Sequence, residues 1–129
     1  MTCILYLDDS QTQLESVREA LSTKGHEVRT AQTVEEALLC MQDGRVELGL
    51  IDFHMPGQSG AEALQQIRAR ANPPSNVRFF IYTTDNRAQG DYRKLSFHGA
   101  ILRKGDMQAL LLQLDPVVRL LELTKLARR

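Results

Sequence analysis

The sequence predicts an α/β fold in which a doubly wound, five-stranded parallel sheet is packed with five helices. Short apolar segments alternate with segments of helical periodicity along the whole chain of 129 residues. Such alternation is typical of βαβ units that build a parallel sheet. Because the crossovers between parallel strands are right-handed, the helices are expected on both faces of the sheet. The chain length fits one domain.

The first strand, helix and second strand are indicated by the segments up to Thr30. Cys3–Asp8 is a short apolar run closed by carboxylates. Ser10 is a favourable N-cap for a helix whose apolar residues recur at helical spacing, and Gly25 favours its end. A short second strand is expected over Glu27–Thr30.

The middle of the chain repeats this order with two capping-box signatures. Thr33–Glu36 opens the second predicted helix, and Asp43-Gly44 ends it. The third strand follows as the apolar run Val46–Asp52. Ser59–Glu62 opens a third helix, which Asn72–Pro74 stops.

The last third of the chain is less regular. Phe79–Tyr82 is an apolar run that predicts the fourth strand, and Ala100–Arg103 predicts the fifth. Between them, Asn86–His98 is weakly patterned. Asp106 is placed to cap a last helix rich in leucine.

A second helix start is indicated near the C-terminus. Asp115 suits an N-cap and Pro116 suits the first helical position. We therefore expect the α/β domain over 1–115 and a C-terminal helical extension or linker over 116–129. A simple extension of the last helix, a dimerising helix and the start of a linker to a further domain are the alternatives.

Composition excludes several classes of protein. Sixteen basic and sixteen acidic residues cancel, so we expect no direct nucleic-acid partner. No stretch reaches the roughly eighteen apolar residues of a membrane span, and the N-terminus lacks a basic segment before its apolar run. Cys3 and Cys40 have no metal-ligand spacing and are expected as packed thiols. These features predict a cytoplasmic protein that does not bind a membrane.

Functional residue types stand at the ends of four predicted strands. In an open α/β sheet the ligand site lies beyond the carboxyl ends of the strands, so these residues should converge on one edge. Each residue alone has an ordinary explanation, such as a helix start, a turn, a strand threonine or a solvated lysine. Their coincidence indicates a site. They are Asp8 and Asp9, Asp52, Thr83 and Lys104.

The chemistry of this set points to phosphoryl transfer. Three carboxylates in one cleft repel each other unless a cation lies among them, and Mg²⁺ is the cation that suits a few carboxylates. Asp52 can act as a ligand and as a nucleophile that forms an acyl phosphate. The Lys104 ammonium and the Thr83 hydroxyl would neutralise charge on the transferred group.

These residues resemble the response-regulator receiver domains of two-component signalling, chemotaxis regulators among them. The motifs that carry the resemblance lie between about Cys3 and about Leu114, nearly the whole chain. The resemblance implies a flavodoxin-like strand order of 2-1-3-4-5. The motifs are Asp8-Asp9, Ile51-Asp52-Phe53-His54-Met55-Pro56-Gly57 with Gly60, Thr83 and Lys104.

The resemblance also implies roles for individual residues. Asp52 would accept a phosphoryl group from a histidine kinase or a phosphotransfer protein, with Thr83 and Lys104 contacting that group. The chain would be a signalling switch, not an enzyme, with only self-phosphorylation and slow autodephosphorylation. The face made by the fourth helix, fifth strand and fifth helix would bind a partner or form a homodimer. The Mg²⁺ ligands would be Asp8, Asp9, Asp52 and the main-chain carbonyl of His54.

The sequence departs from the family pattern in three places. Gly105 follows Lys104 where most receivers have proline, so we expect a trans peptide bond and a shifted loop. Ile101 stands where the family usually has a switching aromatic residue. Gly99-Ala100 lies closer to the lysine than usual, which predicts a shortened loop.

Two other classes of protein compete with the switch. One is a receiver-like interaction module that works without phosphorylation, for which the complete set of five polar residues would be unnecessary. The other is a phosphatase of the haloacid dehalogenase type, which carries an Asp-x-Asp motif on its first strand. Here Asp8 and Asp9 are adjacent, and the chain has no room for a cap domain.

Overall fold

A five-stranded parallel sheet forms the centre of the computed structural model, which describes residues 1–127. Arg128 and Arg129, at the end of the predicted 116–129 segment, lie outside the described residues. The strand order is β2-β1-β3-β6-β7, which confirms the predicted order 2-1-3-4-5. Its strands are β1 (Cys3–Leu7), β2 (Glu27–Ala31), β3 (Leu48–Asp52), β6 (Arg78–Tyr82) and β7 (Gly99–Ile101).

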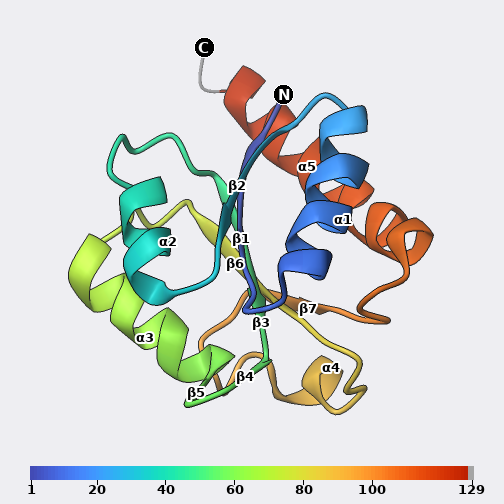
Figure 1. Ribbon diagram of the computed structural model, residues 1–129. Helices are drawn as coiled ribbons and strands as arrows, with labels where there is room; N and C mark the ends of the chain where they lie inside the picture. Colours follow the sequence, from blue (N-terminus) through green and yellow to red (C-terminus); the bar gives the residue numbers. More distant parts are fainter. Residues whose placement is uncertain (128–129) are drawn as a thin grey trace.

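Helices cover both faces of this sheet (Figure 1). α2 and α3 pack on one face, where their apolar residues join Leu5, Ile51 and Phe79 in one core cluster. α1 and α5 pack on the other face against a second cluster that includes Tyr6 and Tyr82. The helices are α1 (Gln11–Thr23), α2 (Val34–Cys40), α3 (Gly60–Ala71), α4 (Ala88–Asp91) and α5 (Met107–Ala127).

The predicted helix starts carry the expected caps. The Ser10 hydroxyl accepts the Gln13 amide, and Ser59 forms a complete capping box with Glu62. The Thr33 hydroxyl accepts the Glu36 amide at 3.1 Å, but the Glu36 carboxylate bonds to the amide of Gln32 instead of closing the box. Capping chemistry in the sequence therefore located these three helix starts.

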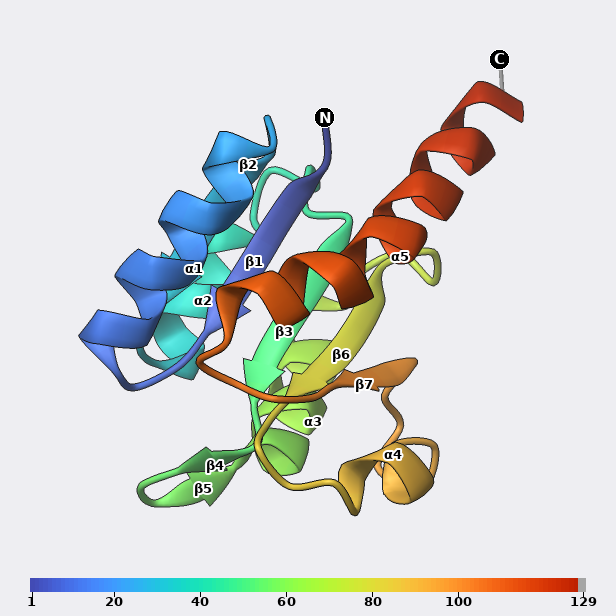
Figure 2. The ribbon, with the colours of Figure 1, turned by 90° about the vertical axis from the view of Figure 1, so that its right-hand side faces the viewer.

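Two short strands, β4 (His54–Met55) and β5 (Gln58–Ser59), form a hairpin that the sequence patterns did not predict. The hairpin is separated from Asp52 only by Phe53 and turns at Gly57, whose φ is +84°. Because each strand has only two residues, apolar alternation cannot reveal it. The hairpin and α4 lie at the same end of the sheet (Figure 2).

The predicted helix start at Asp115 and Pro116 is wrong. α5 is one helix of 21 residues with Pro116 inside it. A proline inside a helix removes one backbone hydrogen bond and bends the axis, and Figure 2 shows α5 changing direction midway. The second half of α5 carries exposed leucines at 120, 123 and 126.

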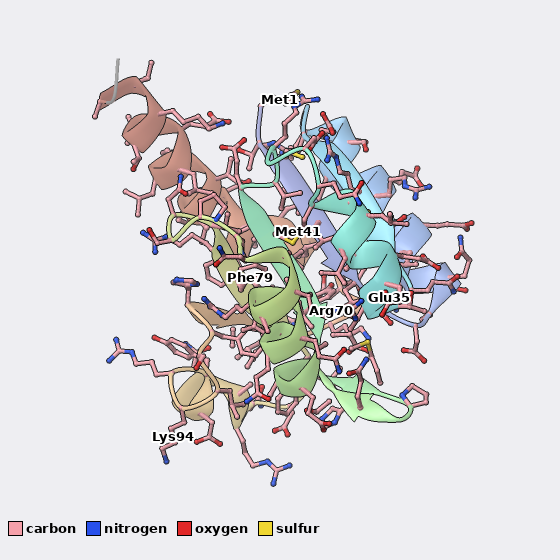
Figure 3. The ribbon with its side chains drawn as sticks, turned by 90° about the vertical axis from the view of Figure 1, so that its left-hand side faces the viewer. Met1, Glu35, Met41, Arg70, Phe79 and Lys94 are labelled. Carbon is pink, nitrogen blue, oxygen red and sulfur yellow. The ribbon has the colours of Figure 1, made fainter. Side chains whose placement is uncertain are left out.

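Two side-chain contacts join neighbouring elements of the fold. Arg70 on α3 forms an ion pair with Glu35 on α2 at 2.6 Å, and both are labelled in Figure 3. Gln113 on α5 bonds both backbone groups of Leu102, at 2.7 and 2.8 Å, directly after β7. No helix within the described residues is long and apolar enough to span a bilayer.

Candidate functional site

Three carboxylates meet at the carboxyl ends of β1 and β3, as the sequence predicted. The two strands are neighbours in register, with Leu7 beside Ile51, so the residues after Leu7 lie next to Asp52. Asp8, Asp9 and Asp52 each offer an oxygen within 4.8 Å of the others. Asp8 is 0% exposed and Asp52 is 4% exposed, whereas Asp9 faces solvent.

Lys104 enters this cluster from the loop after β7. Its Nζ lies 2.9 Å from Asp8 Oδ2 and 2.8 Å from Asp52 Oδ1, and its side chain is 17% exposed. The Lys104 amide also donates to the carbonyl of Thr83 at 3.2 Å, which fixes the loop to the end of β6. We call Asp8, Asp9, Asp52 and Lys104 the acidic pocket.

The two buried carboxylates of the acidic pocket are held differently. Burial raises the pKa of Asp8, but hydrogen bonds from Tyr6, Lys104 and the Ser10 amide together outweigh it and lower the pKa. For Asp52, burial and the nearby charge of Asp8 raise the pKa, and the ammonium of Lys104 offsets only part of this effect. Burial lowers the pKa of Lys104, but the two carboxylates raise it above its usual value. Of these two carboxylates, Asp52 is therefore the one whose charge is less compensated.

Tyr6 is a member of the site that the sequence reading missed. Its hydroxyl donates a hydrogen bond to Asp8 Oδ2, and the side chain is fully buried. Burial, and then the bond to Asp8, raise the pKa of Tyr6, so the hydroxyl remains a donor. The signal was available, because residues two apart on a strand face the same side of the sheet.

Thr83 and His54 lie beside the acidic pocket. The amide of Thr83 bonds to the carbonyl of Ile101, and its buried hydroxyl accepts the amide of Asp85 at 3.0 Å. The backbone of His54 offsets a small part of the rise in the pKa of Asp52, while the imidazole is exposed and contacts the ring of Phe53. The structure thus places Thr83 next to the pocket residues along the strand ends and turns the His54 ring towards solvent.

The donor set of the acidic pocket fits a hard divalent cation. Three carboxylates and one ammonium leave two negative charges uncompensated among these four residues. Two of the carboxylates are buried, where such an excess is costly. Oxygen ligands in this number suit Mg²⁺, which keeps several of its waters.

The described part of the chain contains no cis peptide bond, so the predicted trans bond between Lys104 and Gly105 is confirmed. Gly105 has a φ of +98°, a conformation that proline cannot adopt. Ile101, which replaces the usual aromatic residue, is buried in the cluster beneath α5.

Comparisons with known proteins agree with this arrangement. The family model of the response regulator receiver domain matches residues 4–115. The chain is 34% identical over 83 residues to the CAI-1 autoinducer sensor kinase/phosphatase CqsS of Vibrio cholerae, covering 64% of this chain and 12% of that protein. It is 36% identical over 66 residues to the response regulator MprA of Mycobacterium strain KMS, covering 51% and 29%. The chain thus spans less than a third of the length of either relative.

A solved structure gives the same family. The chemotaxis protein CheY4 of Vibrio cholerae superposes with a TM-score of 0.77 at 25% identity, covering 91% of this chain and 98% of that one. The fold is therefore shared over almost the full length of the chain. The residues matched by the family model include the predicted site residues Asp8, Asp9, Asp52, Thr83 and Lys104. The chain belongs to the response regulator receiver domain family, the signalling modules of two-component systems.

Proposed function

We propose that this domain is a phosphoacceptor switch in which a histidine kinase or a phosphotransfer protein phosphorylates Asp52. One observation carries the proposal. The Asp52 carboxylate ends a central strand, is 4% exposed, and lies 2.8 Å from Lys104 within an acidic pocket of excess negative charge. This is the arrangement that phosphoryl transfer to a carboxylate needs: a fixed nucleophile with positive charge beside it.

The reaction follows from these groups. A carboxylate oxygen of Asp52 attacks the phosphorus of a phosphohistidine, the new P–O bond forms, and the P–N bond breaks. The electron pair leaves on the imidazole nitrogen, which takes up a proton. In this proposal Lys104, which contacts Asp8 in the structure, turns towards the phosphoryl oxygens, and the buried Thr83 donates its hydroxyl to them.

The metal that fits the acidic pocket is Mg²⁺. Asp8, Asp9, Asp52 and the main-chain carbonyl of His54 would hold it, and when bound it neutralises charge on the phosphoryl oxygens. The response regulator TrrA of Thermotoga maritima was solved in complex with Mg²⁺ and BeF, and its fold matches this chain with a TM-score of 0.68 at 24% identity. That complex supports the choice of metal.

We further propose how the signal leaves the site. Phosphorylation adds nearly two negative charges and draws Thr83 and Lys104 inward, which biases the adjacent surface between two states. That surface comprises α4, β7 and α5, where a partner or a second copy would bind. In this proposal residues 1–115 are the receiver domain in the cytoplasm, and residues 116–129 are an extension or linker.

The first test is the intact mass of the protein after incubation with acetyl phosphate and Mg²⁺. We expect one phosphoryl group that hydroxylamine removes and that a chelator prevents. Asp52→Asn should abolish the gain. Asp91→Asn, a change at an exposed aspartate on α4, is the matched control and should leave it intact.

The competing interaction module predicts a different result. The wild-type protein would stay unmodified although folded, and beryllofluoride with Mg²⁺ would fail to bind. Those two results together would replace the phosphoacceptor switch by a module that works without phosphorylation.

A further inference from the structure

We infer that Tyr6 and Tyr82 are positioning residues that fix the two partners of the Asp8–Lys104 ion pair from inside the core. Tyr6 holds the carboxylate, and Tyr82 holds the backbone that carries the lysine. The inference rests on the proposed function, because it concerns how the phosphoacceptor site keeps its geometry while Lys104 changes partners.

The first half of the argument concerns Asp8. Its Oδ2 accepts both the Tyr6 hydroxyl and Lys104 Nζ, and its Oδ1 accepts the Ser10 amide at 2.9 Å. When Lys104 turns towards a phosphoryl group, Tyr6 and Ser10 still hold one oxygen each. The orientation of this carboxylate therefore does not depend on the lysine. Groups that orient a metal ligand in this way strongly influence metal affinity.

The second half concerns the backbone of the β7–α5 loop. The Gly105 amide donates to the Tyr82 hydroxyl at 3.2 Å, and the Lys104 amide donates to the Thr83 carbonyl at 3.2 Å. Two consecutive amides are thus bonded to the end of β6. The side chain of Lys104 can move while its backbone stays in place. Proline at position 105 would have no N–H for Tyr82 to accept.

The two tyrosines form one unit. Their rings pack edge to face, with centroids 5.7 Å apart and planes at 70°. Both side chains are fully buried, and they come from β1 and β6, the strands on either side of the strand that carries Asp52. From this packed pair of rings, the Tyr6 hydroxyl contacts Asp8 and the Tyr82 hydroxyl contacts the backbone next to Lys104.

The test removes one hydroxyl at a time and keeps the ring. In Tyr6→Phe we expect the Kd for Mg²⁺, measured by calorimetry, to rise about tenfold because the carboxylate loses a fixed donor. In Tyr82→Phe we expect the Mg²⁺ affinity to stay within about twofold, since Lys104 is not a ligand. The initial phosphorylation rate at saturating Mg²⁺ should instead fall about tenfold. The Gly105 amide signal in the metal-free ¹⁵N spectrum should shift and exchange faster.

Two controls separate positioning from packing. Tyr92→Phe changes a half-buried tyrosine outside the pair and should match wild type. Ile4→Val trims a fully buried residue of the same core cluster and should lower stability without changing metal affinity or rate.

The inference is overturned if the wild-type protein binds no Mg²⁺, if Tyr6→Phe binds Mg²⁺ like Tyr92→Phe, or if Tyr82→Phe leaves the Gly105 signal unchanged. It is also overturned if both tyrosine variants change affinity and rate together, as loss of packing would. If wild type binds Mg²⁺ but takes up no phosphoryl group, the proposed function fails. The Mg²⁺ affinities and the Gly105 signal still decide the inference in that case.

Discussion

Two clusters of charged residues in this protein differ in how their charges are balanced. The acidic pocket has three carboxylates and one ammonium. The second cluster lies between β2 and the end of α2. In it, Arg29 bonds Glu27 at 2.7 Å and Asp43 at 2.8 and 2.9 Å. Arg45 also bonds Glu27, at 3.0 Å. We call this second group, which has two cations and two anions, the Arg29 cluster.

This difference in charge balance indicates which of the two clusters can bind a ligand. The Arg29 cluster satisfies its own charges and needs nothing further, so it joins two elements of the fold. The acidic pocket leaves negative charge uncompensated around two buried carboxylates, which a bound cation would balance. A surplus of buried charge, more than the number of charged residues, distinguishes a ligand site from a structural ion pair.

The largest effect is expected from removing the cation of the acidic pocket. Lys104→Met leaves Asp8 and Asp52 facing each other without the ammonium. We expect the free energy of unfolding to fall by about 3 kcal/mol in the presence of a chelator. Mg²⁺ should restore part of this loss, because it replaces the missing positive charge. Urea unfolding with and without Mg²⁺ measures both the loss of stability and its recovery. Unchanged stability of Lys104→Met in the chelator would show that the ammonium does not offset the charges of Asp8 and Asp52.

The backbone under the acidic pocket should be the next most sensitive feature. A Cβ at Gly60, the first residue of α3, would lie 2.5 Å from the carbonyl oxygen of Asp52. Gly60→Ala should therefore displace Asp52 and cost about 2 kcal/mol of stability, as overpacking does. Gly90→Ala on α4, where a Cβ meets nothing within 4 Å, is the control. Equal unfolding midpoints for the two variants would show that the close approach is unimportant.

A smaller effect is expected when the balanced cluster is broken. Arg29→Met removes the cation that bonds Glu27 and Asp43 near the surface. We expect a loss of about 1 kcal/mol or less, the usual value of surface pairs, and no recovery with Mg²⁺. Recovery with Mg²⁺ would mean that the Arg29 cluster, once opened, also binds the ion.

The smallest effect concerns acid pH. Hydrogen bonds from Arg29, with the Arg45 amide, lower the pKa of Asp43 from 3.8 to about 2. Because the pKa of Asp43 is lower in the folded state than in the unfolded state, its ionised carboxylate stabilises the fold. This stabilisation is fully present above about pH 4 and is lost as the pH falls towards 2. The stability difference between wild type and Asp43→Asn should therefore be constant above pH 4 and shrink below it. Urea midpoints from pH 5 to 2 test this, and a difference that grows on acidification would refute it.

The positions of the acidic pocket residues were predictable because they depend on strand ends. Apolar runs ended by Asp8 and Asp52 are local patterns, and a parallel sheet brings such ends together whatever the intervening loops do. The strand order followed from the family resemblance. In contrast, the partner of each carboxylate depends on side-chain distances across strands, so the double contact of Lys104 with Asp8 and Asp52 could not be read from spacing.

The errors have equally local causes. Asp115 and Pro116 match a helix start in composition, but the apolar residues on both sides continue one helix across them. The packing of α5 against the sheet outweighs the missing hydrogen bond of Pro116. Tyr6 was counted only as a strand residue, although its place two residues before Asp8 puts both side chains on the same side of the sheet. That spacing makes the contact possible, but the hydrogen bond itself depends on the side-chain geometry.

Gln113 has a consequence for self-association. β7 is the outer strand of the sheet and has only three residues. An open strand edge offers unpaired N–H and C=O groups on which another chain can add a strand. The Gln113 amide occupies both groups of Leu102 at the point where this edge would continue. One side chain thus shortens the template available for edge-to-edge aggregation.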